Sequence, residues 1–288
     1  MIQPLMILAH ALALLALPAR AGDLTLQERC YSDLKSMPGK FHEARLRKAC
    51  ESVELLGETC RSVEGVPIYH YDKKSLKPGP RNILVFSLVH GDELTAGSVA
   101  RAWMERLTDI EPRNNWRIIP VQNPDGWKRK TRVNANGVDV NRNFPTKDWS
   151  EGALKYWETK TKKDPRRFPG HKANSEPETK CAVEHIERYK PDLILSIHNP
   201  YGVLDFDGPK ITFPKYPHIP WKSLGNYPGS LGRYMWVDQS KPTLTIELHS
   251  HGVEKDLERF DRLQDITGDI AIRSEKKIQE EKNGKKAP

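Results

Sequence analysis

The chain is organised around one stretch, Ile83-Leu-Val-Phe-Ser-Leu-Val-His-Gly-Asp-Glu-Leu94. It opens with a continuous apolar run, which is typical of a strand buried on both faces of a sheet. The residues that follow, 94–107, carry apolar side chains at helical spacing and predict a helix. His90 and Glu93 therefore fall at the turn from strand to helix. An imidazole and a carboxylate three residues apart on such a turn can bind one cation, and zinc accepts both as ligands.

Strand and helix patterns alternate along the rest of the chain. Apolar or β-branched runs predict strands, and apolar residues at helical spacing predict helices. The expected strands are residues 63–71, 83–89, 116–121, 191–197 and 243–248, and the expected helices are 94–107, 175–189 and 253–276. We expect the 175–189 helix to begin with a capping box from Ser175 to Glu178. The alternation predicts an α/β fold, with a mixed, largely parallel twisted sheet and helices on both faces.

Two long loops interrupt this pattern. Residues 122–171 are rich in Asn, Gly, Pro and charged side chains, and residues 199–227 are rich in Gly and Pro. A loop of about 50 residues without periodicity is uncommon in a compact domain and usually has a function. Because ligands of α/β folds bind beyond the strand ends, we expect the first loop to border the functional site.

The N-terminus has the pattern of a secretory signal peptide. Residues 5–17 are almost entirely Leu, Ile, Met and Ala, and Ala19-Arg20-Ala21 is a small-x-small cleavage site. We expect cleavage after residue 21 and a mature protein that is periplasmic or secreted. The apolar run is shorter than the ~20 residues of a membrane span, so we expect no stable membrane insertion after cleavage. An uncleaved anchor is the alternative.

The mature chain divides by composition into three parts. Residues 22–60 are polar with a helical rhythm and predict a short N-terminal helical extension. This extension either packs on the main domain or is removed as a pro-segment, and we prefer packing because it is too short to cover an active site. We expect one catalytic domain over residues 61–275 and a basic tail over 276–288.

Four cysteines are present, an even number in a chain that we expect to be exported. Such a count favours two disulfides, for which three connectivities exist. We favour Cys30–Cys50, which joins two short expected helices, and this pairing leaves Cys60–Cys181. The cysteine spacing does not resemble a metal-binding motif, so we expect no zinc site made of cysteine.

The formal net charge of +8 becomes +7 when the signal peptide, whose one charged residue is Arg20, is removed. The basic residues concentrate in 160–172 and 276–286. A solvated surface and a frayed terminus account for such runs without any ligand. The alternative is attraction to an anionic polymer such as a cell wall, or to an acidic membrane surface. Export argues against nucleic acid as a partner, and we expect a monomer.

A third ligand candidate follows the expected 191–197 strand. His198 stands directly after this strand, and a catalytic zinc site needs three protein ligands with one position open. With His90 and Glu93 the chain supplies such a set. Asp92 lies between the first two, so it either competes with Glu93 or orients His90 from outside the ligand set.

A base candidate lies in the last expected strand. Alternation places Thr243, Thr245 and Glu247 on one face, and Leu244, Ile246 and Leu248 on the other. An acid in an apolar strand must be paired or lie at a wet site. We interpret Glu247 as a carboxylate beside the metal, and a buried ion pair is the alternative.

The 122–171 loop holds the candidates for binding a substrate carboxylate. It contains Asn123-Pro-Asp-Gly126, then Arg129 and Arg132, then Asn141-Arg142-Asn143. The planar fork of arginine suits a carboxylate, and a positioned arginine stabilises an oxyanion. Most arginines in loops are merely solvated, so these residues gain meaning only beside the metal candidates.

In this order the motifs resemble those of the zinc carboxypeptidase (metallocarboxypeptidase, or funnelin) family. The likeness covers about residues 62–255 and rests on five motifs: His90-x-x-Glu93, Asn123-Pro-Asp-Gly126, Asn141-Arg142-Asn143, Ser196-Ile-His198 and Thr245-Ile-Glu247. Within the family the chain is most similar to bacterial murein peptide amidases. The segments that carry this similarity are 132–145, Asp148-Trp-Ser-Glu-Gly152, 174–179 and Pro228-Gly-Ser-Leu-Gly232.

The resemblance implies a role for each candidate residue. The implied set is His90, Glu93 and His198 for one Zn2+, Glu247 as general base and then acid, Arg132 (or Arg129) for the oxyanion, Asn141 and Arg142 for the terminal carboxylate of the substrate, Tyr227 as a cap, and Leu231 in the specificity pocket. One position departs from the pattern, because Asn199 stands where the amidases tend to have Asp, and this puts the surroundings of His198 in doubt.

The resemblance also implies a reaction. Murein peptide amidases cleave the amide between γ-D-glutamate and meso-diaminopimelate, so we expect peptidoglycan peptides as substrates. A signal peptide is not typical of that group, and export would place the reaction on the wall itself. The alternatives are a general secreted carboxypeptidase that acts on protein C-termini, an amidohydrolase of N-acyl amino acids, and a non-catalytic wall-binding protein on the same scaffold.

Overall fold

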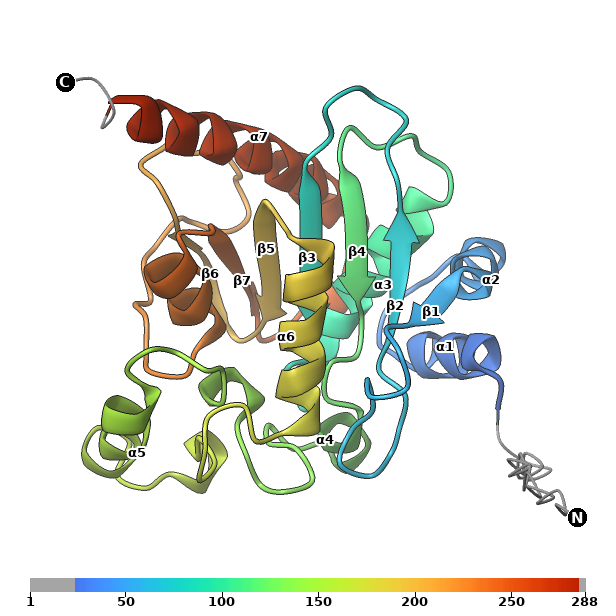
Figure 1. Cartoon of the computed structure of the whole chain (residues 1–288). Coiled ribbons are helices and arrows are strands. Elements are labelled where there is room, and N and C mark those ends of the chain that lie inside the picture. Colours follow the sequence, from blue (N-terminus) through green and yellow to red (C-terminus); the bar gives the residue numbers. More distant parts are fainter. Residues whose placement is uncertain (1–23, 285–288) are drawn as a thin grey trace, which may run out of the picture.

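The computed structural model describes residues 24–284, and within this range the strands form one seven-stranded sheet (Figure 1). The strands are β1 (Val53–Leu55), β2 (Tyr69–Lys73), β3 (Asn82–Ser87), β4 (Asn115–Ile119), β5 (Leu193–His198), β6 (Tyr201–Asp207) and β7 (Thr243–His249). Their order across the sheet is β1-β2-β4-β3-β5-β7-β6. The four central strands are parallel, and β1, β2 and β6 are antiparallel to their neighbours. The mixed, largely parallel sheet predicted from the sequence is therefore confirmed.

Helices cover both faces of this sheet. They are α1 (Leu26–Lys35), α2 (Glu43–Glu51), α3 (Leu94–Leu107), α4 (Pro124–Arg129), α5 (Trp149–Thr159), α6 (Pro177–Tyr189) and α7 (Asp261–Gly284). Figure 1 shows α6 in front of the sheet and α3 behind it, and both contact β3. Helix α5 lies below the carboxyl ends of the parallel strands, on the side where the candidate ligands are found.

Strand β3 shows why the central strands are apolar throughout. Ile83 and Val85 pack into the hydrophobic cluster formed with α3 and α7, whereas Leu84 and Phe86 pack into the cluster on the α6 side. All four side chains are buried. Burial of each such side chain contributes about 1.5–3 kcal/mol to the free energy of unfolding, so the strand is fixed from both faces. This arrangement fixes the position of the residues that follow β3, at the carboxyl ends of the parallel strands.

The N-terminal segment is a helical pair that packs on α3. Helix α1 begins with a capping box between Thr25 and Glu28, and a disulfide from Cys30 to Cys50 links α1 to α2. The second disulfide joins Cys60 to Cys181 on α6. Both pairings agree with the connectivity favoured from the sequence.

Arg101 holds this helical pair to α3 through backbone carbonyls. Its side chain is fully buried, and its two Nη atoms donate to the carbonyls of Leu34, Met37, Pro38, Gly39 and Lys40 at 2.9–3.1 Å. These carbonyls lie at the end of α1 and in the connection to α2, where a helix leaves its last acceptors free. The guanidinium therefore takes the place of the missing helical donors.

Several sequence predictions of local structure are wrong, and of the strand expected over 63–71 only the part from Tyr69 is present, in β2. Helices α4 and α5 lie within 122–171, and β6 lies within 199–227, where loops were expected. The capping box at Ser175 is absent, because α6 begins at Pro177 without a side-chain cap. The Ser175 hydroxyl instead donates to the Glu176 carboxylate, and Glu178 accepts from Asn134. Tertiary partners have taken the groups that a local cap would use.

The two ends of the chain are only partly described. The expected signal peptide, residues 1–21, lies outside the described residues, so the structure does not test it. The terminal helix starts later than expected, after two short 3-10 turns, and continues to Gly284. Within residues 24–284, no helix is long and apolar enough to cross a membrane.

Candidate metal centre and substrate cleft

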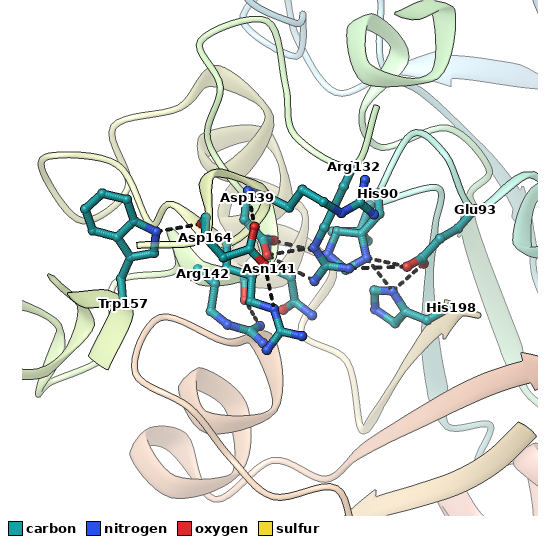
Figure 2. Close-up of polar contacts among 12 residues, drawn as sticks. His90, Glu93, Arg132, Asp139, Asn141, Arg142, Trp157, Asp164 and His198 are labelled. Atoms are coloured by element: carbon teal, nitrogen blue, oxygen red, sulfur yellow. Dashed lines mark hydrogen bonds and ion pairs between the residues drawn. The ribbon is translucent and has the colours of Figure 1, made fainter. Parts of the chain in front are cut away.

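Three ligand candidates meet beyond the carboxyl ends of two neighbouring parallel strands. His90 follows β3, Glu93 directly precedes α3, and His198 is the last residue of β5. The Nδ1 atoms of the two histidines are 3.1 Å apart, and each lies 2.8 Å from an oxygen of Glu93 (Figure 2). The residues are only 3%, 6% and 2% exposed, respectively. Two imidazole nitrogens and one carboxylate oxygen are donors that zinc prefers, so the set fits this ion.

Each imidazole is held through its other nitrogen. Nε2 of His90 lies 3.1 Å from Asp139 Oδ1, and Nε2 of His198 lies 2.7 Å from the Ser196 hydroxyl. These contacts turn both Nδ1 atoms toward Glu93 and fix the rings in place. Asp92, proposed from the sequence as a ligand or as the partner of His90, is in neither position, because its carboxylate pairs with Arg166 at 2.7 Å.

Sequence reasoning missed Asp139 in this role. Its position in the sequence could have indicated the role, because Asp139 stands two residues before Asn141 in the loop that was expected to border the site. Burial alone would raise the pKa of Asp139, but the charges of Arg132 and His90 outweigh burial and lower it. For Glu93 burial likewise opposes ionisation, and the two imidazoles outweigh it. Both acids therefore remain carboxylates at neutral pH.

Glu247 lies beside the three ligand candidates. It is on β7, which pairs with β5 in a register that sets Glu247 opposite His198. The alternation expected for β7 is present, with Leu244, Ile246 and Leu248 in the core and Glu247 lining the cleft. Burial, followed by the negative charge of Glu93, raises the pKa of Glu247. Among the described residues its hydrogen bond is a long one, 3.5 Å, from the backbone N–H of Tyr201, which leaves the carboxylate available for proton transfer.

The predicted oxyanion residue, Arg132, also lines this cleft. So do Asn141 and Arg142, the residues predicted to bind the substrate carboxylate, which we call the carboxylate clamp. Arg132 lies 3.0 Å from Asp139 and 3.4 Å from Glu93, so its guanidinium is adjacent to the ligand candidates. The guanidinium carbon of Arg142 lies 5.0 Å from the ring centre of Tyr227, which also lines the cleft.

Two predicted substrate-binding side chains are not in the cleft. Arg129 ends α4, and the left-handed conformation of Lys130 turns the chain there, so Arg129 points outward and pairs with Glu64 at 2.7 Å. Leu231 is 2% exposed and packs in the hydrophobic cluster on the α6 side. Only its backbone serves the site, because its N–H donates to the side-chain oxygen of Asn141 at 2.9 Å.

An acidic pair, Asp205 and Asp207, forms the part of the cleft that the sequence did not predict. Both residues are on β6 with their side chains toward the same space, and the cleft they line has a volume of about 590 Å3. Burial raises the pKa of both, and for Asp207 burial together with the charge of Asp205 raises it to about 6. Neither has an ion-pair partner within residues 24–284, although Asn226 donates to Asp207 at 2.9 Å. A partly buried acidic pair without a cation is suited to a positively charged ligand.

Comparison with known proteins places the chain in a family. The family of zinc carboxypeptidases matches residues 44–206, more than half of the 288-residue chain. Murein peptide amidase A of Escherichia coli K12 is 32% identical over 147 residues, which are 50% of this chain and 59% of that protein. Murein peptide amidase A of Vibrio campbellii is 29% identical over 216 residues, 69% of this chain and 83% of that protein.

Two solved structures share the fold. The murein-tripeptide amidase of E. coli O157 superposes with a TM-score of 0.58 at 22% identity, over 75% of this chain and 91% of that one. Bovine thrombin-activatable fibrinolysis inhibitor, in complex with tick carboxypeptidase inhibitor, gives 0.62 at 18% identity, over 88% and 98%. At these identities the likeness shows the fold alone. Together with the family match over residues 44–206, it shows that the chain belongs to the zinc carboxypeptidase family of metallopeptidases.

Proposed function

We propose that this chain is an exported zinc peptidase that hydrolyses the amide between γ-D-glutamate and meso-diaminopimelate in peptidoglycan peptides. The observation that carries the proposal is the pairing of a carboxylate clamp with an acidic pair in one cleft, beside three metal-ligand candidates. The names of the relatives from E. coli and V. campbellii point to the same substrate class.

The ligand set in this proposal is His90, Glu93 and His198. When bound there, Zn2+ supplies a Lewis acid that polarises a carbonyl and makes water a better nucleophile near neutral pH. Glu247, whose raised pKa suits proton transfer in both directions, takes a proton from the attacking water and then donates it to the leaving nitrogen. Arg132 donates to the oxygen that becomes negative when water adds to the amide.

The clamp residues decide which bond is cut. Arg142 and Asn141 bind the carboxylate of the leaving residue, and Tyr227 covers that end of the cleft. Because the carboxylate is fixed, the amide one residue away is held at Glu247 and Arg132, and internal bonds of a long chain are not. The position of the bond therefore follows from the fixed carboxylate, while the neighbouring acidic pair selects the residue that leaves.

The acidic pair supports diaminopimelate as the leaving residue. After its first amino group is used in the amide, diaminopimelate still carries a second ammonium at the far end of its side chain. Asp205 and Asp207 give that ammonium a charge-assisted partner in a buried setting. An apolar side chain would leave these partly buried acids without a cation, which is costly.

A second candidate uses the same acidic pair. A secreted carboxypeptidase that removes a C-terminal lysine or arginine from proteins would also present a cationic side chain there. A wall-binding protein without activity accounts for the fold but gives no use to Glu247 beside a complete ligand set. The two disulfides are compatible with work outside the cytoplasm under either activity.

The test offers the zinc-loaded protein three substrates. These are L-alanyl-γ-D-glutamyl-meso-diaminopimelate, a peptide that ends in lysine and the same peptide ending in leucine, with products identified by mass spectrometry. We expect release of free diaminopimelate at the highest kcat/KM. Preferred release of lysine would select the second candidate, and release of leucine at a similar rate would overturn the role of the acidic pair.

A further inference from the structure

One charged segment of the cleft has no part in the reaction described so far. It is the short 3-10 helix η2 (Pro165–Arg167), which lies in the basic run 160–172. Asp164, Arg166 and Arg167 all line the same cleft as the ligand candidates. The cleft thus has two guanidinium groups beyond Arg132 and Arg142.

The segment is fixed in place at both of its ends. The Trp157 indole donates to the Asp164 carbonyl at 2.7 Å (Figure 2). The Asp164 carboxylate accepts from the backbone N–H of Arg166. On the other side, the carbonyl of Phe168 accepts from the backbone N–H of Asp139 at 2.8 Å. Asp139 also contacts His90, so the segment and the metal-ligand candidates share one framework.

The two arginines of η2 point to different parts of the cleft. The positive charge of Arg167 acts on Arg142, whose pKa is lowered first by burial and also by Arg167. Arg166 instead pairs with Asp92, the residue before the ligand candidate Glu93, at 2.7 Å. Arg166 therefore lies in the cleft beside Asp92 and the ligand candidate Glu93, within reach of a substrate bound at the ligand candidates.

Arg166 is able to exchange partners. Its side chain is 59% exposed, and an ion pair made by so exposed a side chain contributes little to stability. A guanidinium has five N–H groups, so it can bind a second carboxylate while it still contacts the first. Arg132, by contrast, contacts Asp139 and Glu93 and is already assigned to the carbonyl oxygen of the cleaved amide in the proposed function.

The chemistry of the proposed substrate supplies that second carboxylate. A glutamyl residue linked through its γ-carbonyl keeps a free α-carboxylate on the acyl side of the bond to be cut, whereas an ordinary α-linked residue has an amide there. We infer that Arg166 is a specificity residue that binds this α-carboxylate and so distinguishes γ-glutamyl amides from ordinary peptides. The inference rests on the proposed function and adds to it a recognition group for the acyl half.

The test compares two substrates that differ in one group. One is L-alanyl-γ-D-glutamyl-meso-diaminopimelate, and the other is the same tripeptide with the glutamyl α-carboxylate converted to a neutral carboxamide. For the wild-type protein we expect kcat/KM to be about tenfold higher on the carboxylate substrate, as one charge-assisted hydrogen bond at a partly exposed site would give. Arg166→Gln should lose this preference by a lower kcat/KM on the carboxylate substrate alone.

Two further variants isolate the effect. Asp92→Asn leaves Arg166 without its competitor and should keep or increase the preference. Arg188→Gln is the matched control, because Arg188 is an equally exposed, ion-paired arginine on α6 and does not line the cleft. It should leave both rates unchanged.

The outcomes separate this inference from the proposed function. If the wild-type protein cleaves both tripeptides equally, or if Arg166→Gln lowers both rates by the same factor, the inference is wrong while the proposed function stands. If neither tripeptide is cleaved, both are wrong. Retention of part of the preference by Arg166→Lys, with an unchanged melting temperature, supports a charge role over a structural one.

Discussion

Helix α3 contacts two buried charged regions that differ in how their charges are satisfied. Midway along the helix, both Nη atoms of Arg101 have backbone carbonyl acceptors from the N-terminal helical pair. At its start, Glu93 borders a cleft in which Asp205 and Glu247 are buried and Asp207 is half-buried, and these acids have no cationic partner among the described residues. In the first region the chain itself supplies the acceptors of both Nη atoms and the counter-charge of Glu105, and the region stabilises the fold. The second is complete only with a metal and a substrate, which is the pattern of a functional site.

Removal of the metal should have the largest effect on the cleft region. We expect dialysis against a zinc chelator to abolish tripeptide hydrolysis and added Zn2+ to restore it, because three converging donors have no other shared function. The circular dichroism spectrum should persist, since the core and disulfides do not depend on these residues. Full activity in protein shown to be metal-free by mass spectrometry would contradict the assignment of His90, Glu93 and His198.

The next largest effect is expected from Glu247→Gln. Loss of a general base and acid should lower kcat by about 10²–10⁴-fold while zinc content stays the same. The change also removes an uncompensated buried acid, so the free energy of unfolding should not fall. Measurements of kcat, bound zinc and urea denaturation on one preparation check all three points. If kcat stays within a factor of two of wild type, another group is the base.

Arg101→Met should lower stability without lowering activity, the opposite of Glu247→Gln. Removal of the guanidinium leaves backbone carbonyls buried without donors, and we expect a loss of about 3 kcal/mol in the free energy of unfolding. The kcat of the protein that remains folded should be unchanged. Arg106→Met, on the same helix but in partly exposed ion pairs, is the control and should cost about 1 kcal/mol or less. Equal losses of stability in the two variants would show that buried Arg101 contributes no more to the fold than the partly exposed Arg106.

The smallest expected effect is a pH dependence of substrate binding. The pKa of Asp207 is raised to about 6, so the side chain is ionised at pH 7.5 and gains a proton as the pH falls through 6. The KM for the tripeptide should therefore rise below pH 6, because a neutral acid attracts the ammonium less. In Asp207→Asn we expect a KM about tenfold higher at pH 7.5 and a weaker pH dependence.

The stability of Asp207→Asn tests whether the ionised Asp207 side chain lowers the free energy of unfolding. An acid whose pKa is raised in the folded state lowers stability when it is ionised, above its unfolded pKa. Asp207→Asn should therefore be as stable as the wild type or more stable at pH 7.5. A clear loss of stability with an unchanged KM would show that Asp207 stabilises the fold and does not bind the substrate.

The sequence predicted those parts of the site that depend on local patterns. Helix α3 has the predicted bounds, Leu94–Leu107, because its apolar spacing is regular. His90 and His198 converge as expected because β3 and β5 are adjacent parallel strands whose ends meet. Both predictions needed only the pattern within an element and the general geometry of a parallel sheet.

The acidic pair could not be predicted in this way. Strand β6 contains Gly202, Asp205 and Asp207, residue types that are depleted in strands, and its pairing with β7 is set by tertiary contacts. Without the strand, the alternation that brings Asp205 and Asp207 to the same space could not be recognised. Helix α5 was missed for a similar reason, because Gly152 interrupts a short helical pattern in a polar segment.

Under the proposed function, the position of Arg142 beside the Tyr227 ring decides which peptidoglycan peptides the chain could act on. If Arg142 binds the carboxylate on the diaminopimelate carbon that carries the cleaved amide nitrogen, a stem peptide with a further residue has that carboxylate tied up in a peptide bond. Such peptides, including those joined to a neighbouring strand through that residue, must first be trimmed by a hydrolase of different specificity. The enzyme would then act late, on ends that others have prepared, and would shorten stems without opening the cross-linked mesh.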